Sequence, residues 1–142
     1  MTALTGIAMM MIAAQLAAAP ALADALADSR DLHDTISARS AVLESLIEKV
    51  DDATQTAADI ERLVYVPSSK GEKAWTLKAM EAGGADNPYR KYTVCLEASS
   101  DFNVYVTDIQ HALRTGVAVP KIPAQRDYRK GLATCAGLLR SP

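Results

Sequence analysis

Apolar residues recur in alternating steps of four and three through residues 32–64, the spacing of one face of a long helix. Nine of the ten positions in this series are apolar, and the exception is Arg39. We therefore predict one helix over about residues 30–65, with Ser29 as its N-cap and Asp31 in its first turn. Further apolar residues beside this series widen the face, which favours packing in a bundle over a two-stranded coiled coil.

Helix start and stop signals predict the next two helices. Pro67-Ser68-Ser69 and Gly71 are expected to break the first helix, and Gly83-Gly84 to end a short second helix over residues 72–82. Asn87 followed by Pro88 is typical of a helix start. A third helix is therefore expected over residues 88–115.

A fourth helix is predicted over residues 124–139, after an extended linker at Val117–Pro123 that contains two prolines. Cys135 falls on the apolar face of this helix, and Cys95 falls on the apolar face of the third. The extended linker is long enough to bring the two cysteines to one level. The fold class is therefore all-α, a small helical bundle whose C-terminal helix pair is joined by a disulfide.

The first 23 residues carry no charged side chain and end in the small-x-small sequence Ala21-Leu22-Ala23. This pattern predicts a signal peptide whose cleavage leaves Asp24 as the mature N-terminus. The expected Lys or Arg near the start is missing, so two alternatives remain. Residues 3–23 have about the length of a membrane span and are a possible anchor, or the segment is an internal apolar helix.

Export determines how the two cysteines are interpreted. They lie 40 residues apart, outside any Cys-x-x-Cys motif, which argues against a zinc or redox site. In an oxidising compartment such a pair closes a structural bridge, and the chain-entropy model assigns this loop about 4 kcal/mol. We predict the disulfide Cys95–Cys135; the alternative is a cytosolic protein with two buried thiols.

Residues 24–142 have the length of a single domain whose charge is unevenly distributed. The segment 24–66 has ten acidic and four basic residues, a net charge of −6, and the segment 67–142 has seven and eleven, a net charge of +4. Halves of opposite charge attract within a fold or in head-to-tail assembly. The basic segment is too dilute and too poor in aromatic residues to predict a nucleic-acid surface.

Candidate chemistry is sparse. Asp108 and His111 lie one helical turn apart, but a bundle metal site needs a second such pair, and the only other histidine is His33. A haem site with Met80 lacks an attachment motif, and neither a nucleophile motif nor a glycine-rich phosphate loop occurs. The sequence predicts no cofactor, no metal and no enzymatic activity.

Two groups of side chains are candidates for binding a partner. Four acidic residues are expected on the outer face of the long helix: Glu44, Glu48, Asp51 and Asp52. Tyr65 and Trp75 flank the turn predicted at Pro67–Lys73, where aromatic side chains commonly anchor interfaces. Packing in the core is the alternative for both aromatic residues, since the chain has only seven.

These features together predict an exported, non-catalytic helical protein that acts by binding protein, either its own copies or another chain. A structural subunit of a bacterial envelope, pilus or secretion apparatus is the first hypothesis. The alternative is a soluble periplasmic immunity or inhibitor protein that blocks an effector. Membrane anchoring through residues 3–23 is compatible with the first hypothesis.

Overall fold

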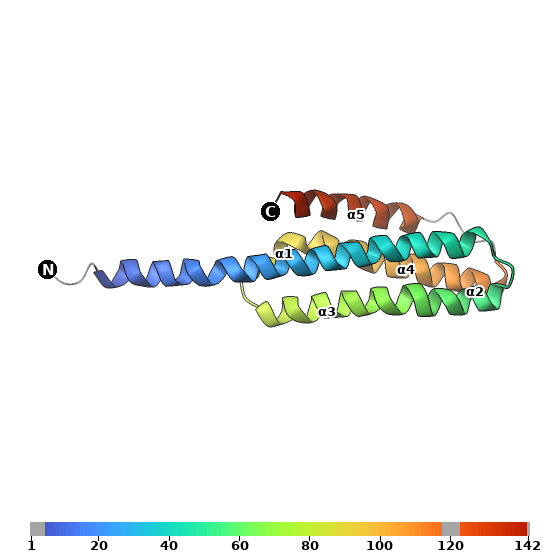
Figure 1. The fold of residues 1–142 in the computed structure, drawn as a ribbon, viewed down its shortest axis with the longest axis horizontal. Coiled ribbons are helices and arrows are strands. Elements are labelled where there is room, and N and C mark those ends of the chain that lie inside the picture. The colour runs from blue at the N-terminus through green and yellow to red at the C-terminus, as the bar shows by residue number, and fades with distance from the viewer. Residues whose placement is uncertain (1–4, 118–122, 142) are drawn as a thin grey trace.

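The computed structural model describes residues 5–117 and 123–141, which form a bundle of helices without strands (Figure 1). The predicted all-α bundle is therefore confirmed. Residues 118–122, most of the predicted linker, lie outside the described part. In chain order the elements are α1 (Thr5–Glu48), α2 (Ala53–Ile60), the π-helical turn η1 (Glu61–Tyr65), α3 (Val66–Ala82), the 3₁₀ turn η2 (Pro88–Tyr92), α4 (Thr93–Thr115) and α5 (Pro123–Arg140).

The helix predicted over residues 30–65 is wrong in its bounds, because α1 ends at Glu48 and the chain reverses direction before α2 (Figure 1). Asp52 is the residue at which the second helix, α2, is capped. Its side chain accepts a hydrogen bond from the backbone N–H of Gln55 at 3.0 Å, as an N-cap residue does. The predicted start near residue 30 is also wrong, since α1 begins at Thr5 and passes through this region.

Pro67 was expected to end a helix, but α2, η1 and α3 follow one another without a break. Pro67 has no N–H to offer the carbonyl of Leu63, four residues earlier. Arg39 of α1 donates to this oxygen from Nη1 at 3.2 Å, which explains the one polar position in the apolar series. The short helix predicted over residues 72–82 therefore begins earlier, at Val66.

The helix signals after residue 82 are confirmed. Gly83 ends α3 with a φ of 45°, and Gly116 ends α4 in the left-handed conformation with a φ of 69°. Asn87 caps the next segment by accepting from the backbone N–H of Tyr89 at 3.0 Å. That segment opens with the 3₁₀ turn η2 before it continues as α4.

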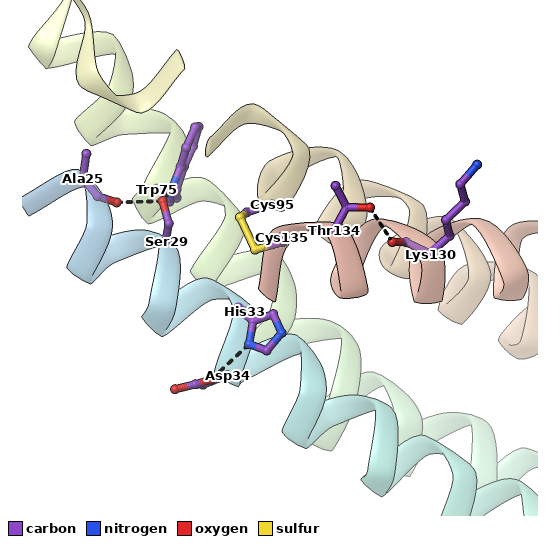
Figure 2. The surroundings of a disulfide bond; sticks show 9 residues. All are labelled: Ala25, Ser29, His33, Asp34, Trp75, Cys95, Lys130, Thr134 and Cys135. Carbon is purple, nitrogen blue, oxygen red and sulfur yellow. Dashed lines mark hydrogen bonds and ion pairs between the residues drawn. A yellow bond between two sulfur atoms is a disulfide. The ribbon is translucent and has the colours of Figure 1, made fainter. Parts of the chain in front are cut away.

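The disulfide between Cys95 of α4 and Cys135 of α5 is confirmed, with Cα atoms 5.0 Å apart (Figure 2). One turn away, Gly131 of α5 lies directly against Ala98 of α4. Beyond it, the ring of Tyr128 packs between two aromatic rings of α4. Covalent, backbone and aromatic contacts therefore join α5 to α4 along three successive turns.

The core lies where α4 contacts α1, α2, α3 and α5. Its fully buried large side chains are Tyr92, Tyr128, Phe102, Ile36, Leu43, Ile60, Ile109, Val64 and Val106. The N-terminal part of α1 extends past the other helices as an arm, while its C-terminal part lies along the bundle (Figure 1). The predicted leader boundary between Ala23 and Asp24 lies inside α1.

Candidate functional site

Trp75 belongs to the core and does not anchor an exposed turn. It is 5% exposed, and its indole Nε1 donates to Ser29 Oγ at 2.9 Å (Figure 2). Ser29 in turn donates to the carbonyl of Ala25 at 2.7 Å. Ser29 is therefore a buried link between α1 and α3, not the N-cap predicted for it, and the turn predicted at Pro67–Lys73 is helical.

Tyr65 is half-buried and borders an open groove between α3 and α4. Glu72 lies in this groove, and its carboxylate accepts from Ser99 Oγ at 3.2 Å, Ser100 Oγ at 3.0 Å and Asn103 Nδ2 at 2.5 Å. All three donors are uncharged. Glu72 was not among the candidates predicted from the sequence, because only the packing of α3 against α4 brings it to these three donors.

The four acidic candidates do not form one face of a helix as expected. Glu44 forms an ion pair with Arg129 of α5, and Asp52 uses its carboxylate to cap α2. Glu48 and Asp51 are exposed, one at the last position of α1 and the other in the bend. Two of the four carboxylates therefore have structural contacts, and two remain candidates for docking.

A second polar cluster surrounds Asp28 and joins α1 to α3 and η2. Asp28 pairs with Lys78 and accepts from the hydroxyl of Tyr89 at 2.5 Å. Burial, reinforced by this hydrogen bond, raises the pKa of Tyr89 well above its ordinary value. The hydrogen bond to Asp28 likewise raises the pKa of Lys78. These contacts, like that of Glu44 with Arg129, join the acidic segment to the basic one, as the charge distribution predicts.

The structure does not bring the two histidines together. His33 of α1 borders a groove with Ala136 of α5, whose neighbour Cys135 is bridged to Cys95 of α4. His111 follows Cys95 by sixteen residues on α4, about 24 Å along a helix. Across the described side chains, no group of three or more His, Cys, Asp or Glu residues is arranged to hold a metal ion.

The outer side of α3 is the surface that the sequence analysis missed. Val66, Leu77 and Met80 are 52%, 60% and 72% exposed. Exposed apolar side chains are ordinary when they are scattered. These three share one side of a single helix, where they form a candidate contact surface.

Neither a protein-family model, nor a curated protein, nor a solved structure matches this chain. Among the residues whose side chains the structure describes, which begin at Ala21, no helix has both the length and the apolar character needed to cross a membrane. The disulfide is compatible with an oxidising location outside the cytoplasm.

Proposed function

We propose that this chain is an exported, non-catalytic helical protein that acts by binding protein, as a structural subunit of a bacterial envelope, pilus or secretion assembly. The observation that carries the proposal is the arm of α1, which continues past the other helices of the bundle (Figure 1). A helix without neighbours has little tertiary packing to stabilise it, so the arm gains most from contact with another chain.

The composition of the arm supports this role. Residues 7–16 are apolar except for Gln15, and the whole leader is uncharged. If the leader is retained, this segment packs against neighbouring subunits or anchors the protein at a membrane through residues 3–23. If it is cleaved after Ala23, the remaining bundle binds through its own surface, and export is still required for the disulfide.

The second candidate is a soluble periplasmic immunity or inhibitor protein. The groove beside Tyr65 favours it, because Glu72 lies there among neutral donors, open to a partner's side chain. Exposed Glu48 and Asp51 at the bend would add an acidic contact for a basic effector.

Intact mass and native size, measured on protein recovered from its own cell envelope, separate the two candidates. A subunit is expected in a complex several times heavier than the 15.1 kDa chain. A processed monomer beginning at Asp24 would refute the subunit and favour the soluble binder. An unprocessed chain beginning at Met1 would argue against the soluble inhibitor.

A further inference from the structure

The side of α1 that faces away from the core carries mainly small and acidic residues over four turns. Arg30, the exposed basic residue of this stretch, is directed to α5, where it donates to the carbonyl of Leu139 at 3.1 Å. We call these five exposed residues the acidic stripe: Ala27, Asp31, Asp34, Ala38 and Ala41. They follow one another in steps of four, three, four and three residues. Leu32 and Ile36 lie on the opposite, buried side of the helix. The stripe is C-terminal to Ala23, so it is present whether or not the leader is removed.

The side of α3 that faces away from the core carries large apolar and basic residues. We call these five exposed residues the basic stripe: Val66, Lys70, Lys73, Leu77 and Met80. They too follow one another in steps of four, three, four and three residues. Ser68 and Trp75 lie on the opposite, buried side. The stripe contains no acidic residue, and the acidic stripe contains no basic one.

The two stripes match position by position when the helices are laid parallel. The lysine pair is three residues apart and falls opposite the aspartate pair Asp31 and Asp34, which has the same separation. Each of the three large apolar side chains falls opposite an alanine. Steps of four and three are the repeat of helices that pack along their length, and large residues fit against small ones in such contacts.

We propose that α3 of one copy packs along α1 of a second copy, basic stripe on acidic stripe, and that this contact builds the assembly. The inference rests on the proposed function as a subunit. Within one chain α1 and α3 already contact each other through Trp75 and Ser29. Asp31 also lines a shallow groove between these two helices together with Lys78, but all ten residues of the two stripes are exposed. Because the stripes are different surfaces, one copy can place its basic stripe on one neighbour and its acidic stripe on another, so the contact can repeat from copy to copy.

Charge complementarity selects this partner. Asp34 has a side chain that is 79% exposed, and its contact within the chain is with His33 at 3.1 Å. It is therefore accessible to a lysine of another copy. Two opposite-charge pairs fix the register, while the apolar side chains over alanines provide the buried area. The association is expected to weaken with added salt, because salt screens these charges. The Debye length of the solution falls to about 3 Å at 1 M.

A charge-swap experiment tests the interface on the exported protein as purified from the envelope, by sedimentation velocity. One variant carries Asp31→Lys and Asp34→Lys, and the other carries Lys70→Glu and Lys73→Glu. Each alone places like charges across the contact, so self-association is expected to weaken at least about 100-fold. A mixture of the two restores it, because each reversed stripe then meets an opposite charge on the other variant.

The matched control carries Glu97→Lys and Asp101→Lys on the exposed side of α4, with the same change in net charge as the aspartate variant. It should associate like the wild type. Far-UV circular dichroism and the disulfide show that each variant is folded. The proposal is overturned if wild-type protein is monomeric, if the stripe variants associate as well as the control, or if the mixture stays apart. If a large envelope complex persists in the stripe variants, the subunit role stands and this interface is wrong.

Discussion

The contact between Gly131 of α5 and Ala98 of α4 provides a sharp test of the packing. A Cβ atom added at Gly131 would lie 2.8 Å from the Cβ of Ala98 and 3.3 Å from its Cα. The first distance is shorter than carbon atoms in proteins tolerate, so one helix must shift. The bridge from Cys135, one turn along α5, limits that shift. Gly131→Ala is therefore expected to destabilise this helix pair.

Gly137 on the same helix is the matched control, because a Cβ added there meets no atom within 4 Å. Replacing glycine by alanine inside a helix contributes about 1 kcal/mol of intrinsic stability at either position. Overpacking at Gly131 costs about 1–3 kcal/mol. The Gly131→Ala protein is therefore expected to be less stable than the Gly137→Ala protein by about 1–3 kcal/mol.

Urea unfolding with the disulfide intact, followed by far-UV circular dichroism, measures this difference as a shift in midpoint at constant slope. Adding Ala98→Gly to the Gly131→Ala protein should relieve the contact, which appears as a favourable coupling in a double-mutant cycle. If the two single variants at Gly131 and Gly137 are equally stable, the close approach of α4 and α5 is refuted.

Three further perturbations test other contacts. Ser29→Ala removes the acceptor of the buried Trp75 indole, so we expect a loss of about 1–3 kcal/mol in unfolding free energy, followed by the fluorescence of this single tryptophan; no loss would contradict the link. Asp52→Ala removes the cap of α2 and should cost about 1 kcal/mol in urea unfolding, whereas Asp51→Ala should stay within about 0.5 kcal/mol of wild type. Because the pKa of Tyr89 is raised in the folded protein, its hydroxyl loses a proton at lower pH in the unfolded chain than in the folded one. The stability that this hydroxyl contributes is therefore fully present below about pH 10 and falls above it. Tyr89→Phe should flatten that fall in thermal melts, and an unchanged slope would argue against the burial of this hydroxyl.

The C-terminal half could be predicted from the sequence because its signals are local. The capping side chain of Asn87 and the left-handed Gly116 each act within a few residues of themselves. The apolar faces of the last two helices place Cys95 and Cys135 toward each other. Short-range patterns therefore fix the helix ends and the helix faces on which the two cysteines lie.

The break between α1 and α2 was not predicted, because the spacing of apolar residues continues across it. Both α1 and α2 pack against α4, so the apolar series continues across residues 49–52. The signal for the break was present in Asp52 with Gln55 three residues later, a pattern typical of a helix start. Pro67 was expected to break the helix, because it leaves one backbone carbonyl without a helical donor. Arg39, from another helix, donates a hydrogen bond to that carbonyl, so the helix continues.

The candidate site was harder to predict for the same reason. Which side of α3 is buried depends on its packing against α1 and α4, and this packing places Trp75 in the core while Leu77 and Met80 are exposed. From the sequence, Trp75 was a candidate interface anchor, whereas the exposed residues Leu77 and Met80 were not. Only tertiary contacts distinguish the two sides.

The proposed function requires that the chain is exported and closes its bridge outside the cytoplasm. This is measured by alkylating rapidly quenched cells without reductant and then determining the mass of the protein in envelope and cytoplasmic fractions. We expect envelope protein in which neither Cys95 nor Cys135 is labelled, and in which both are labelled after reduction. Cytoplasmic protein labelled at both cysteines before reduction would contradict this expectation.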